Sequence, residues 1–478
     1  MRISRTVHWA IASCLFAVII ARSITLSFSI DEAMTYNFVI DEWDRIIANN
    51  HKLNTFLMKV FGRVFGHSEW ALRLPNSMSF ILYAWASWRL VRRIPTSWMA
   101  VMASLILLVQ PNLIEFFSLA RGYALGTALL FTSAVLTIEA LDSDCSDGFS
   151  RRRILYASLL ASFGLGAYLA SVNVFIMLSA CILGLQIWKW KRFGWSSLIP
   201  TGLVLAAGFA WGVNELLELS ASEELFYGNE SYIQFWERFQ MYYLWPVYGP
   251  YFMRPSTMLN LLALGMLWPV LIWSLSRKLR AEIVVPLILL VGAAIGWVIE
   301  FEVFDSLLPM HRTSLIYYPL LGMLVVGFIS GMKNVNKPFI KFPTMAVFAV
   351  FAFVILGNFS KAVDFHTLRE WGGSADVKTA MMIVKEYSDE LPREAEIEKH
   401  YNLRSEINYY IRTRGMNVGV NMNMGTELNA EFLLLRIRDF KYAFDDERLT
   451  SKYELVGDYP DSGLRLYIRK DVLSKTSE

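Results

Sequence analysis

Residues 283–299 read IVVPLILLVGAAIGWVI, an apolar run without a single charged side chain. A helix needs about 20 mostly apolar residues to cross a hydrocarbon core roughly 30 Å thick. Runs of this kind recur along the first 360 residues, at 8–28, 70–90, 98–117, 123–141, 154–170, 172–188, 198–217, 258–274, 283–299, 313–332 and 342–358. The sequence therefore predicts an α-helical polytopic membrane protein with about 11 transmembrane helices.

Composition divides the chain into two parts. Of its 478 residues 55% are hydrophobic and 18% charged, which is too apolar for a soluble enzyme. The charge is concentrated at the end, since 39 of the 87 charged residues lie in the last 118. A helical pattern at 375–387 and alternating patterns at 431–438 and 464–469 predict a small α/β domain there. We expect a membrane domain over 1–360 and a soluble domain over 361–478.

Orientation follows from the basic loops, because Lys and Arg accumulate in short cytoplasmic loops. Every second predicted loop is basic, near residues 89–93, 151–153, 189–192, 277–280 and 333–341. This alternation predicts a cytoplasmic N-terminus, an extracytoplasmic C-terminus and two long outer loops, at 30–69 and 218–257. Arg2 and Arg5 precede the first apolar run as in a signal peptide, but no small-residue cleavage site follows, so we expect a retained anchor.

Charge and cysteine usage exclude several classes. The net charge of +3, without a basic tract interleaved with aromatic residues, argues against nucleic acid as a partner. The three cysteines, Cys14, Cys145 and Cys181, form no CxxC pattern, so neither a disulfide framework nor a zinc site is expected.

Asp31 and Glu32 directly follow the first predicted helix, in the string Ser29-Ile30-Asp31-Glu32. Two adjacent carboxylates repel each other, and burial near lipid headgroups would raise the pKa of at least one toward the range useful to a general base. The string also fits a capping box, Ser29-x-x-Glu32, that opens a loop helix. We expect Asp31 to be catalytic, and for Glu32 the catalytic and the structural interpretation both stay open.

Three arginines, Arg73, Arg121 and Arg312, lie at the outer ends of predicted helices, where the orientation rule does not require them. The planar guanidinium binds phosphate, and near a membrane it needs a counter-charge or a lipid headgroup. These residues predict a phosphate site at the outer leaflet, with the alternative that each reaches lipid phosphates by itself. Glu115 lies a short turn before Arg121, so an ion pair or a shared ligand is expected.

The second outer loop is rich in aromatic side chains between Tyr227 and Phe252. Such residues form an interfacial belt, and they also stack on sugar rings or lie along a lipid tail. Both interpretations stay open.

The order of these strings resembles the membrane-embedded GT-C glycosyltransferases, in the branch with protein O-mannosyltransferases and lipid A aminoarabinose transferases. The resemblance covers mainly the first 130 residues. It rests on the Asp31-Glu32 pair, on the string FGHSEWALRLP at 65–75 and on LARGYAL at 119–125, and it resumes weakly at His311-Arg312.

This resemblance implies a sugar carried on a polyprenyl phosphate and transferred outside the membrane to an acceptor hydroxyl. Asp31 would take the acceptor proton, while Arg121, and also Arg73 or Arg312, would steady the leaving phosphate. Direct displacement at the anomeric carbon would invert its configuration. The acceptor would be a lipid, a glycan or a protein, and the location the plasma (inner) membrane.

One string departs from the family pattern. Where many relatives carry a His-Pro-Pro-like string in the first loop, this chain reads NNHKLNT at 49–55. Two interpretations of His51 and Lys52 stay open: they contact the phosphate or the acceptor, or they form an exposed pair in the loop. Some members of the wider superfamily bind a divalent metal with outer-loop carboxylates, but Asp31 and Glu32 alone are too sparse a cage. We therefore expect neither a cofactor nor a metal.

Two rival functions remain. A transporter or flippase of lipid-linked sugars would need polar groups near the membrane midplane, whereas the charges here gather at one face. A non-catalytic scaffold that displays the C-terminal domain would tolerate the replacement of Asp31.

Overall fold

The computed structural model describes residues 2–40, 46–142, 148–244, 280–331, 338–399, 401–421, 428–436 and 446–476. The chain divides into two compact units. The membrane unit holds Met1–Ile20, Arg45–Leu57 and Arg73–Val363. The C-terminal unit holds Ala21–Asp44, Met58–Leu72 and Asp364–Glu478. By packing, the second unit thus begins near the expected boundary at 361 but also takes in most of the first outer loop.

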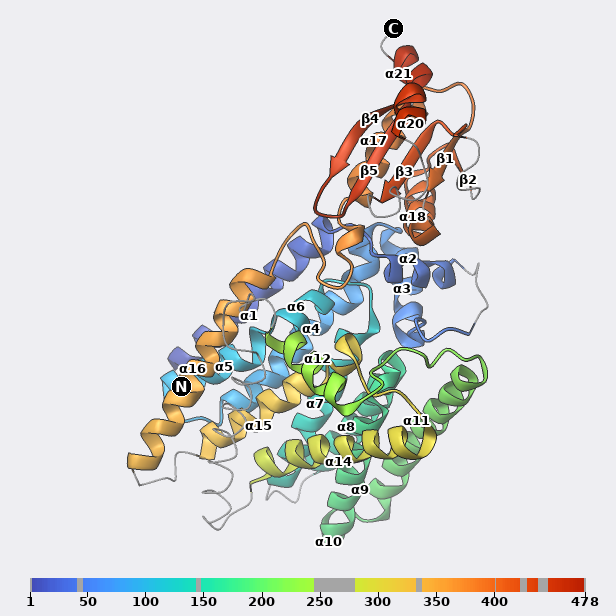
Figure 1. The fold of residues 1–478 in the computed structure, drawn as a ribbon. Helices are drawn as coiled ribbons and strands as arrows, with labels where there is room; N and C mark the ends of the chain where they lie inside the picture. The colour runs from blue at the N-terminus through green and yellow to red at the C-terminus, as the bar shows by residue number, and fades with distance from the viewer. Residues whose placement is uncertain are drawn as a thin grey trace. The chain divides into compact units, whose positions relative to one another are not determined.

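Helices occupy every predicted span that falls on described residues (Figure 1). The helices at these spans are α1 (Arg2–Thr25), α4 (Glu69–Val91), α5 (Ser97–Leu108), α6 (Pro111–Phe117), α7 (Gly122–Asp142), α8 (Gly148–Ala167), α9 (Val172–Trp188), α11 (Trp195–Ala221), α14 (Ala281–Phe304), α15 (Tyr317–Gly331) and α16 (Pro338–Ala362). The predicted span 258–274 lies outside the described residues.

Within the described ranges, six helices are long and apolar enough to cross a membrane, or seven if the bent pair α5 and α6 forms one span. The protein is therefore an integral membrane protein, and the count of about 11 spans is not confirmed. Helix α4 lies at a predicted span but is not among these helices. It buries the polar side chains of Arg73, Asn76 and Ser77 inside the membrane unit.

The α5–α6 break has a clear chemical cause. The two helices meet at 55° around Val109 and Gln110, because Pro111 lacks the N–H that would continue the helical bonding. Side chains satisfy carbonyl groups near the break. The Gln110 Nε2 donates to the Ile106 carbonyl at 2.9 Å, and the Tyr83 hydroxyl donates to the Leu107 carbonyl at 2.7 Å. The break leads the chain through α6 into the Arg121 turn.

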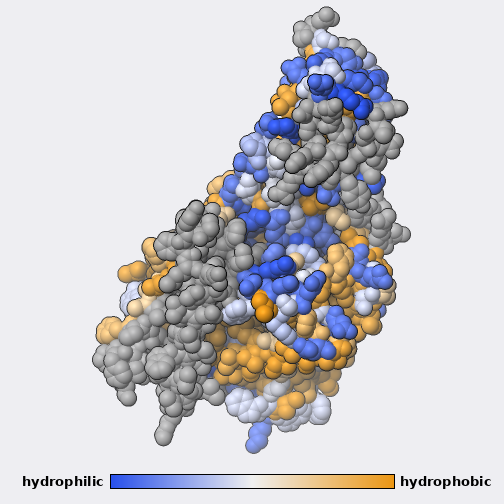
Figure 2. Space-filling model, viewed as in Figure 1, coloured by the Kyte–Doolittle hydropathy of each residue, from blue (hydrophilic) through white to orange (hydrophobic). Residues whose placement is uncertain are grey.

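The helices of the membrane unit face two environments. Helix α7 is buried along most of its length, whereas α14 exposes aliphatic side chains such as Val291, Ile295 and Val303. Figure 2 shows hydrophobic residues in orange over α11 and α14. An apolar surface of this kind is what lipid tails solvate.

The C-terminal unit contains a five-stranded mixed sheet in the order β2-β1-β3-β5-β4. Its strands are β1 (Ala395–Lys399), β2 (Val418–Asn421), β3 (Phe432–Arg436), β4 (Tyr453–Tyr459) and β5 (Leu464–Arg469). Strand β1 pairs in parallel with β2 and β3, and β5 pairs antiparallel with β3 and β4. The helices α17 (Val377–Asp389), α18 (Arg404–Arg414), α20 (Asp446–Lys452) and α21 (Lys470–Thr476) complete the predicted α/β domain.

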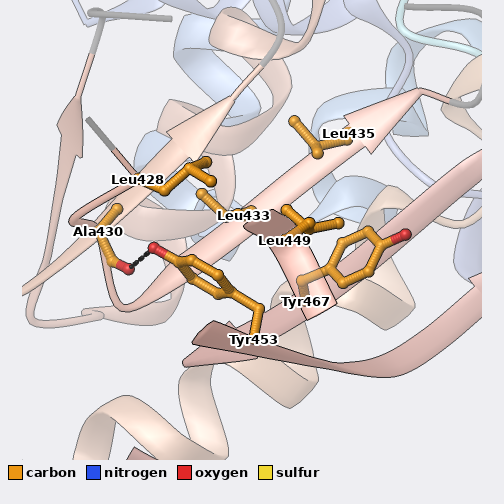
Figure 3. Close-up of a cluster of buried hydrophobic side chains, with 7 residues drawn as sticks. All are labelled: Leu428, Ala430, Leu433, Leu435, Leu449, Tyr453 and Tyr467. Atoms are coloured by element: carbon orange, nitrogen blue, oxygen red, sulfur yellow. Dashed lines mark hydrogen bonds between the residues drawn. The ribbon is translucent and has the colours of Figure 1, made fainter. Parts of the chain in front are cut away.

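One cluster of this domain's core is drawn in Figure 3. Leu433 and Leu435 of β3 contribute to it with Leu449 of α20 and Tyr467 of β5. The Tyr453 hydroxyl donates to the Ala430 carbonyl at 2.7 Å, so this polar group is satisfied within an apolar cluster.

We expect the substitution Gly126→Ala to destabilise the protein by about 1–3 kcal/mol, because the added methyl group overpacks the contact between α7 and α8. A Cβ there would overlap the Cβ of Tyr168 and lie 2.9 Å from the Gly164 carbonyl oxygen. The matched control is Gly184→Ala, since no described atom beyond its own helix lies within 4 Å of that Cβ. Thermal unfolding of the purified protein measures both, and equal midpoints for the two variants would contradict the packing.

Candidate functional site

Asp31 and Glu32 lie in the first turn of the short helix α2 (Ile30–Val39), in the C-terminal unit. Ser29 caps this helix, and the capping box is present in both directions. The Glu32 carboxylate accepts from the Ser29 N–H at 2.9 Å, and the Glu32 N–H donates to the Ser29 hydroxyl at 3.4 Å. Glu32 is fully buried, whereas Asp31 is half-buried. The predicted capping box is therefore present, while the catalytic role of Glu32 stays a prediction.

Arg121 anchors a cluster in the membrane unit. Its guanidinium donates to the Asn49 carbonyl at 3.2 Å and to the Asn49 side-chain oxygen, and its Nη2 lies 3.2 Å from the His51 Nε2. The guanidinium also lies over the Tyr123 ring, at 5.6 Å from its centroid. These contacts join the turn before α3 (Lys52–Phe65) to the beginning of α7.

Arg312 belongs to the same neighbourhood. It lies in the 3₁₀ helix η2 (His311–Ser314), and its guanidinium is 4.5 Å from the centroid of the Tyr227 ring. The Tyr168 hydroxyl holds the η2 backbone, donating to the carbonyls of Arg312 at 3.0 Å and Thr313 at 2.6 Å. His311 adopts a φ of +46°, a left-handed conformation that costs free energy for a residue other than glycine.

His51 is buried beside Arg121 and within electrostatic reach of Arg312. Burial lowers its pKa well below 6.5, and the positive charges of Arg121 and Arg312 lower it further. The imidazole is thus neutral at physiological pH. Because a guanidinium has only donors, the His51 Nε2 must accept, which leaves the proton on Nδ1. The alternative of an exposed loop pair is wrong for His51.

Two local features bring the cluster together. A Cβ on Gly122 would overlap the Ala167 carbonyl oxygen and lie 2.8 Å from the Cβ of His51, so only glycine allows this close approach. The Asn54 amide donates to the Ala120 carbonyl at 3.0 Å and accepts from the Asn76 amide at 2.6 Å. This buried pair of amides ties α3 and α4 to the turn that carries Arg121.

The remaining predicted residues have distinct environments. Lys52 forms an ion pair with Glu215 of α11, and a second carboxylate, that of Glu218, lies 3.8 Å from its Nζ. Its side chain is 48% exposed, which fits the loop-pair interpretation of this residue. Arg73 and Glu115 are both buried in the membrane unit. The structure thus brings His51, Arg121 and Arg312 together, while Asp31 and Glu32 belong to the other compact unit.

Several residues that contact the cluster carry no functional signal in the sequence. Asn49 lies beside His51 in the quoted string, but an asparagine in a turn gives no signal of its own. Tyr123 and Tyr168 lie in apolar runs, where an aromatic residue normally indicates core. Their rings pack edge to face at 5.1 Å, and Tyr123 packs in the same way on His51 at 4.5 Å.

A metal centre has no visible donor set in the described ranges. Across those residues, no group of three or more His, Cys, Asp or Glu side chains is placed to hold a metal ion.

The fold is that of the GT-C membrane glycosyltransferases. The crystal structure of ArnT, an aminoarabinose transferase, from Cupriavidus metallidurans bound to undecaprenyl phosphate matches with a TM-score of 0.55 at 13% identity, over 96% of this chain and 97% of that chain. The apo structure of ArnT matches with the same TM-score and coverage at 11% identity. A second similar structure is that of AglB, an oligosaccharyltransferase from Archaeoglobus fulgidus in complex with an inhibitory peptide and a dolichol-phosphate. Its TM-score is 0.45 at 11% identity, over 90% of this chain and 69% of that chain. No family model and no curated protein matches the sequence.

The pKa of His51 predicts a specific pH dependence of stability. Below pH 6.5 the unfolded chain binds a proton at His51 that the folded chain does not, so the free energy of unfolding falls by about 1.4 kcal/mol per pH unit until the folded pKa is reached. In His51→Gln this contribution disappears, and we expect its unfolding midpoint to decline less between pH 7.5 and 5.5. Parallel declines for wild type and variant would show that His51 is accessible to protons in the folded state.

Proposed function

We propose that the protein transfers a sugar from a polyprenyl-phosphate-linked donor to an acceptor hydroxyl at the outer face of the membrane. The observation that carries the proposal is the cluster of buried Arg121, half-buried Arg312 and buried, neutral His51. It occurs in a chain whose fold matches, over 96% of its length, that of a transferase crystallised with undecaprenyl phosphate.

The cluster suits a phosphate for electrostatic reasons. Guanidinium groups pair with phosphate oxygens through two parallel hydrogen bonds, and burial strengthens such pairs. The Asn49 amide and the His51 imidazole, both neutral, orient the Arg121 guanidinium by hydrogen bonds. A leaving polyprenyl phosphate gains negative charge as its bond to the sugar breaks, which the two guanidinium groups would stabilise.

The transfer step assigns a role to Asp31. The acceptor oxygen attacks the anomeric carbon, the bond from that carbon to the phosphate oxygen breaks, and the acceptor proton passes to the Asp31 carboxylate. The electron pair of the broken bond leaves with the polyprenyl phosphate. A single displacement inverts the anomeric configuration. In this scheme Glu32 keeps α2 folded through its capping box rather than touching substrate.

Location and metal dependence complete the proposal. We place the protein in the plasma (inner) membrane, with the N-terminus cytoplasmic and the C-terminal domain outside. The acceptor is a lipid, a glycan or a protein. We expect transfer without a divalent metal, because Glu32 is engaged by Ser29 and Asp31 alone offers too few oxygen ligands. Transfer at equal rates with EDTA and with added Mg²⁺ or Mn²⁺ supports this expectation, whereas loss with EDTA and recovery with metal contradicts it.

The decisive assay offers a panel of labelled polyprenyl-phosphate sugars to the purified protein together with membrane-extract acceptors. We expect wild type to transfer label from one donor and Asp31→Asn to lose about 100-fold or more in kcat, because the substitution removes the base with little change in size. The control Asp389→Asn removes an exposed carboxylate that pairs with Lys385, and it should transfer like wild type.

Other outcomes would identify the rivals. Full transfer by Asp31→Asn would exclude Asp31 as the base. No transfer from any donor, together with lipid movement across vesicles that the substitution leaves unchanged, would indicate a flippase.

The phosphate role of Arg312 is tested separately. We expect Arg312→Gln to lower kcat/KM for the donor by about 10–100-fold, the value of one or two charge-assisted hydrogen bonds. Arg152→Gln, an exposed arginine on α8, is the control. An Arg312→Gln protein that folds and keeps the wild-type kcat/KM would remove this residue from the site.

A further inference from the structure

The C-terminal sheet domain and most of the first outer loop pack together within one compact unit. Helix α18 lies against α2, the helix that carries Asp31. Two adjacent tyrosines of α18, Tyr409 and Tyr410, are buried there. Their contacts reach both ends of α2.

Tyr410 fixes the N-terminal end. The Phe28 N–H donates to the Tyr410 hydroxyl oxygen at 2.8 Å, and the Phe28 ring stacks on Tyr409 at 4.1 Å with an interplanar angle of 19°. Phe28 immediately precedes Ser29, the N-cap of α2, and Asp31 is the second residue of that helix. A shift at Phe28 would therefore move the carboxylate of Asp31.

Tyr409 fixes the following turns. Its ring packs edge to face on Tyr36 at 5.1 Å, and its hydroxyl donates to the His67 carbonyl at 2.9 Å. The Tyr36 hydroxyl in turn lies 2.6 Å from the His67 Nδ1. Tyr36 and His67 are both first-loop residues, so one aromatic side chain of the sheet domain orders two segments of that loop.

Ion pairs extend the same contact. The buried Glu69 carboxylate, at the beginning of α4, accepts from Arg414 of α18 at 2.9 Å and from Lys378 of α17 at 3.2 Å. The Lys378 Nζ also donates to the Ile24 carbonyl at 3.0 Å, in the last turn of α1. Lys378 thereby satisfies one of the carbonyls that a helix end leaves open.

A ten-residue helix such as α2 is not stable in water by itself, so its position depends on these tertiary contacts. General-base catalysis requires the base within hydrogen-bonding reach of the acceptor proton, and a displacement of 1 Å can cost about 100-fold in rate.

Accordingly, we propose that the C-terminal domain is a positioning element for Asp31, with Tyr409 and Tyr410 as its positioning residues. The inference rests on the proposed function, in which Asp31 is the base. It assigns the domain a role in the chemical step rather than in donor binding.

The test compares three full-length variants. Tyr410→Phe removes the acceptor of the Phe28 N–H, and Tyr409→Phe removes the bond to His67, each without changing the ring. Tyr453→Phe is the matched control, because it removes one buried hydroxyl bond, to Ala430, from the same domain away from the loop. We expect kcat to fall about 10-fold in both α18 variants, with donor KM within twofold of wild type. In Tyr453→Phe the unfolding midpoint should fall while kcat stays unchanged.

Hydrogen exchange of the α2 amides supplies a readout that does not depend on activity. We expect faster exchange over residues 30–39 in Tyr410→Phe and Tyr409→Phe, with the exchange of β3 and β5 unchanged. The proposal would be overturned if folded Tyr409→Phe and Tyr410→Phe kept both the wild-type exchange over residues 30–39 and the wild-type kcat. It would also be overturned if Tyr453→Phe lost as much kcat as these two variants. Should wild type itself transfer no sugar, the proposed function fails, and the α2 exchange still decides whether the domain positions this helix.

Discussion

The burial of the Arg121 guanidinium beside a neutral imidazole is the constraint around which the membrane unit is organised. Burying a charge costs free energy unless hydrogen bonds orient it and an opposite charge can reach it. The turn at Asn49, the beginning of α7 and the helix η2 all converge on this point. Their convergence requires glycine at position 122, where the chain passes close to Ala167 and His51. It also depends on the hydrogen-bonded pair Asn54–Asn76, which holds the Arg121 turn against α3 and α4. These features make sense together if the cluster meets a phosphate.

The second organising feature is the association of the first loop with the C-terminal sheet. Sequence order suggests a membrane domain followed by an appended soluble domain, whereas packing groups residues 21–44 and 58–72 with residues 364–478. The contacts that unite them are buried tyrosines and a carboxylate shared by Lys378 and Arg414, rather than loose surface pairs. The C-terminal sheet and these loop segments therefore form one packed unit.

The sequence predicts the helices well because apolar length and loop charge report directly on membrane crossing. The Ser29-x-x-Glu32 capping box is equally local, and its geometry is as predicted. The catalytic role of Asp31 and the phosphate roles of Arg121 and Arg312 stay predictions. Long-range partners leave no local trace: Lys52 forms an ion pair with Glu215, 163 positions away, and Tyr409 binds His67 across 342 positions. The burial of His51 was equally hidden, because a His-Lys pair in a polar string normally indicates exposure.

A structure of the protein with undecaprenyl phosphate bound would test the central claim most directly. The account predicts the lipid phosphate within hydrogen-bonding distance of the guanidinium groups of both Arg121 and Arg312, with His51 still neutral beside them. A phosphate held elsewhere, with both arginines keeping their present contacts to Asn49 and Tyr227, would contradict it.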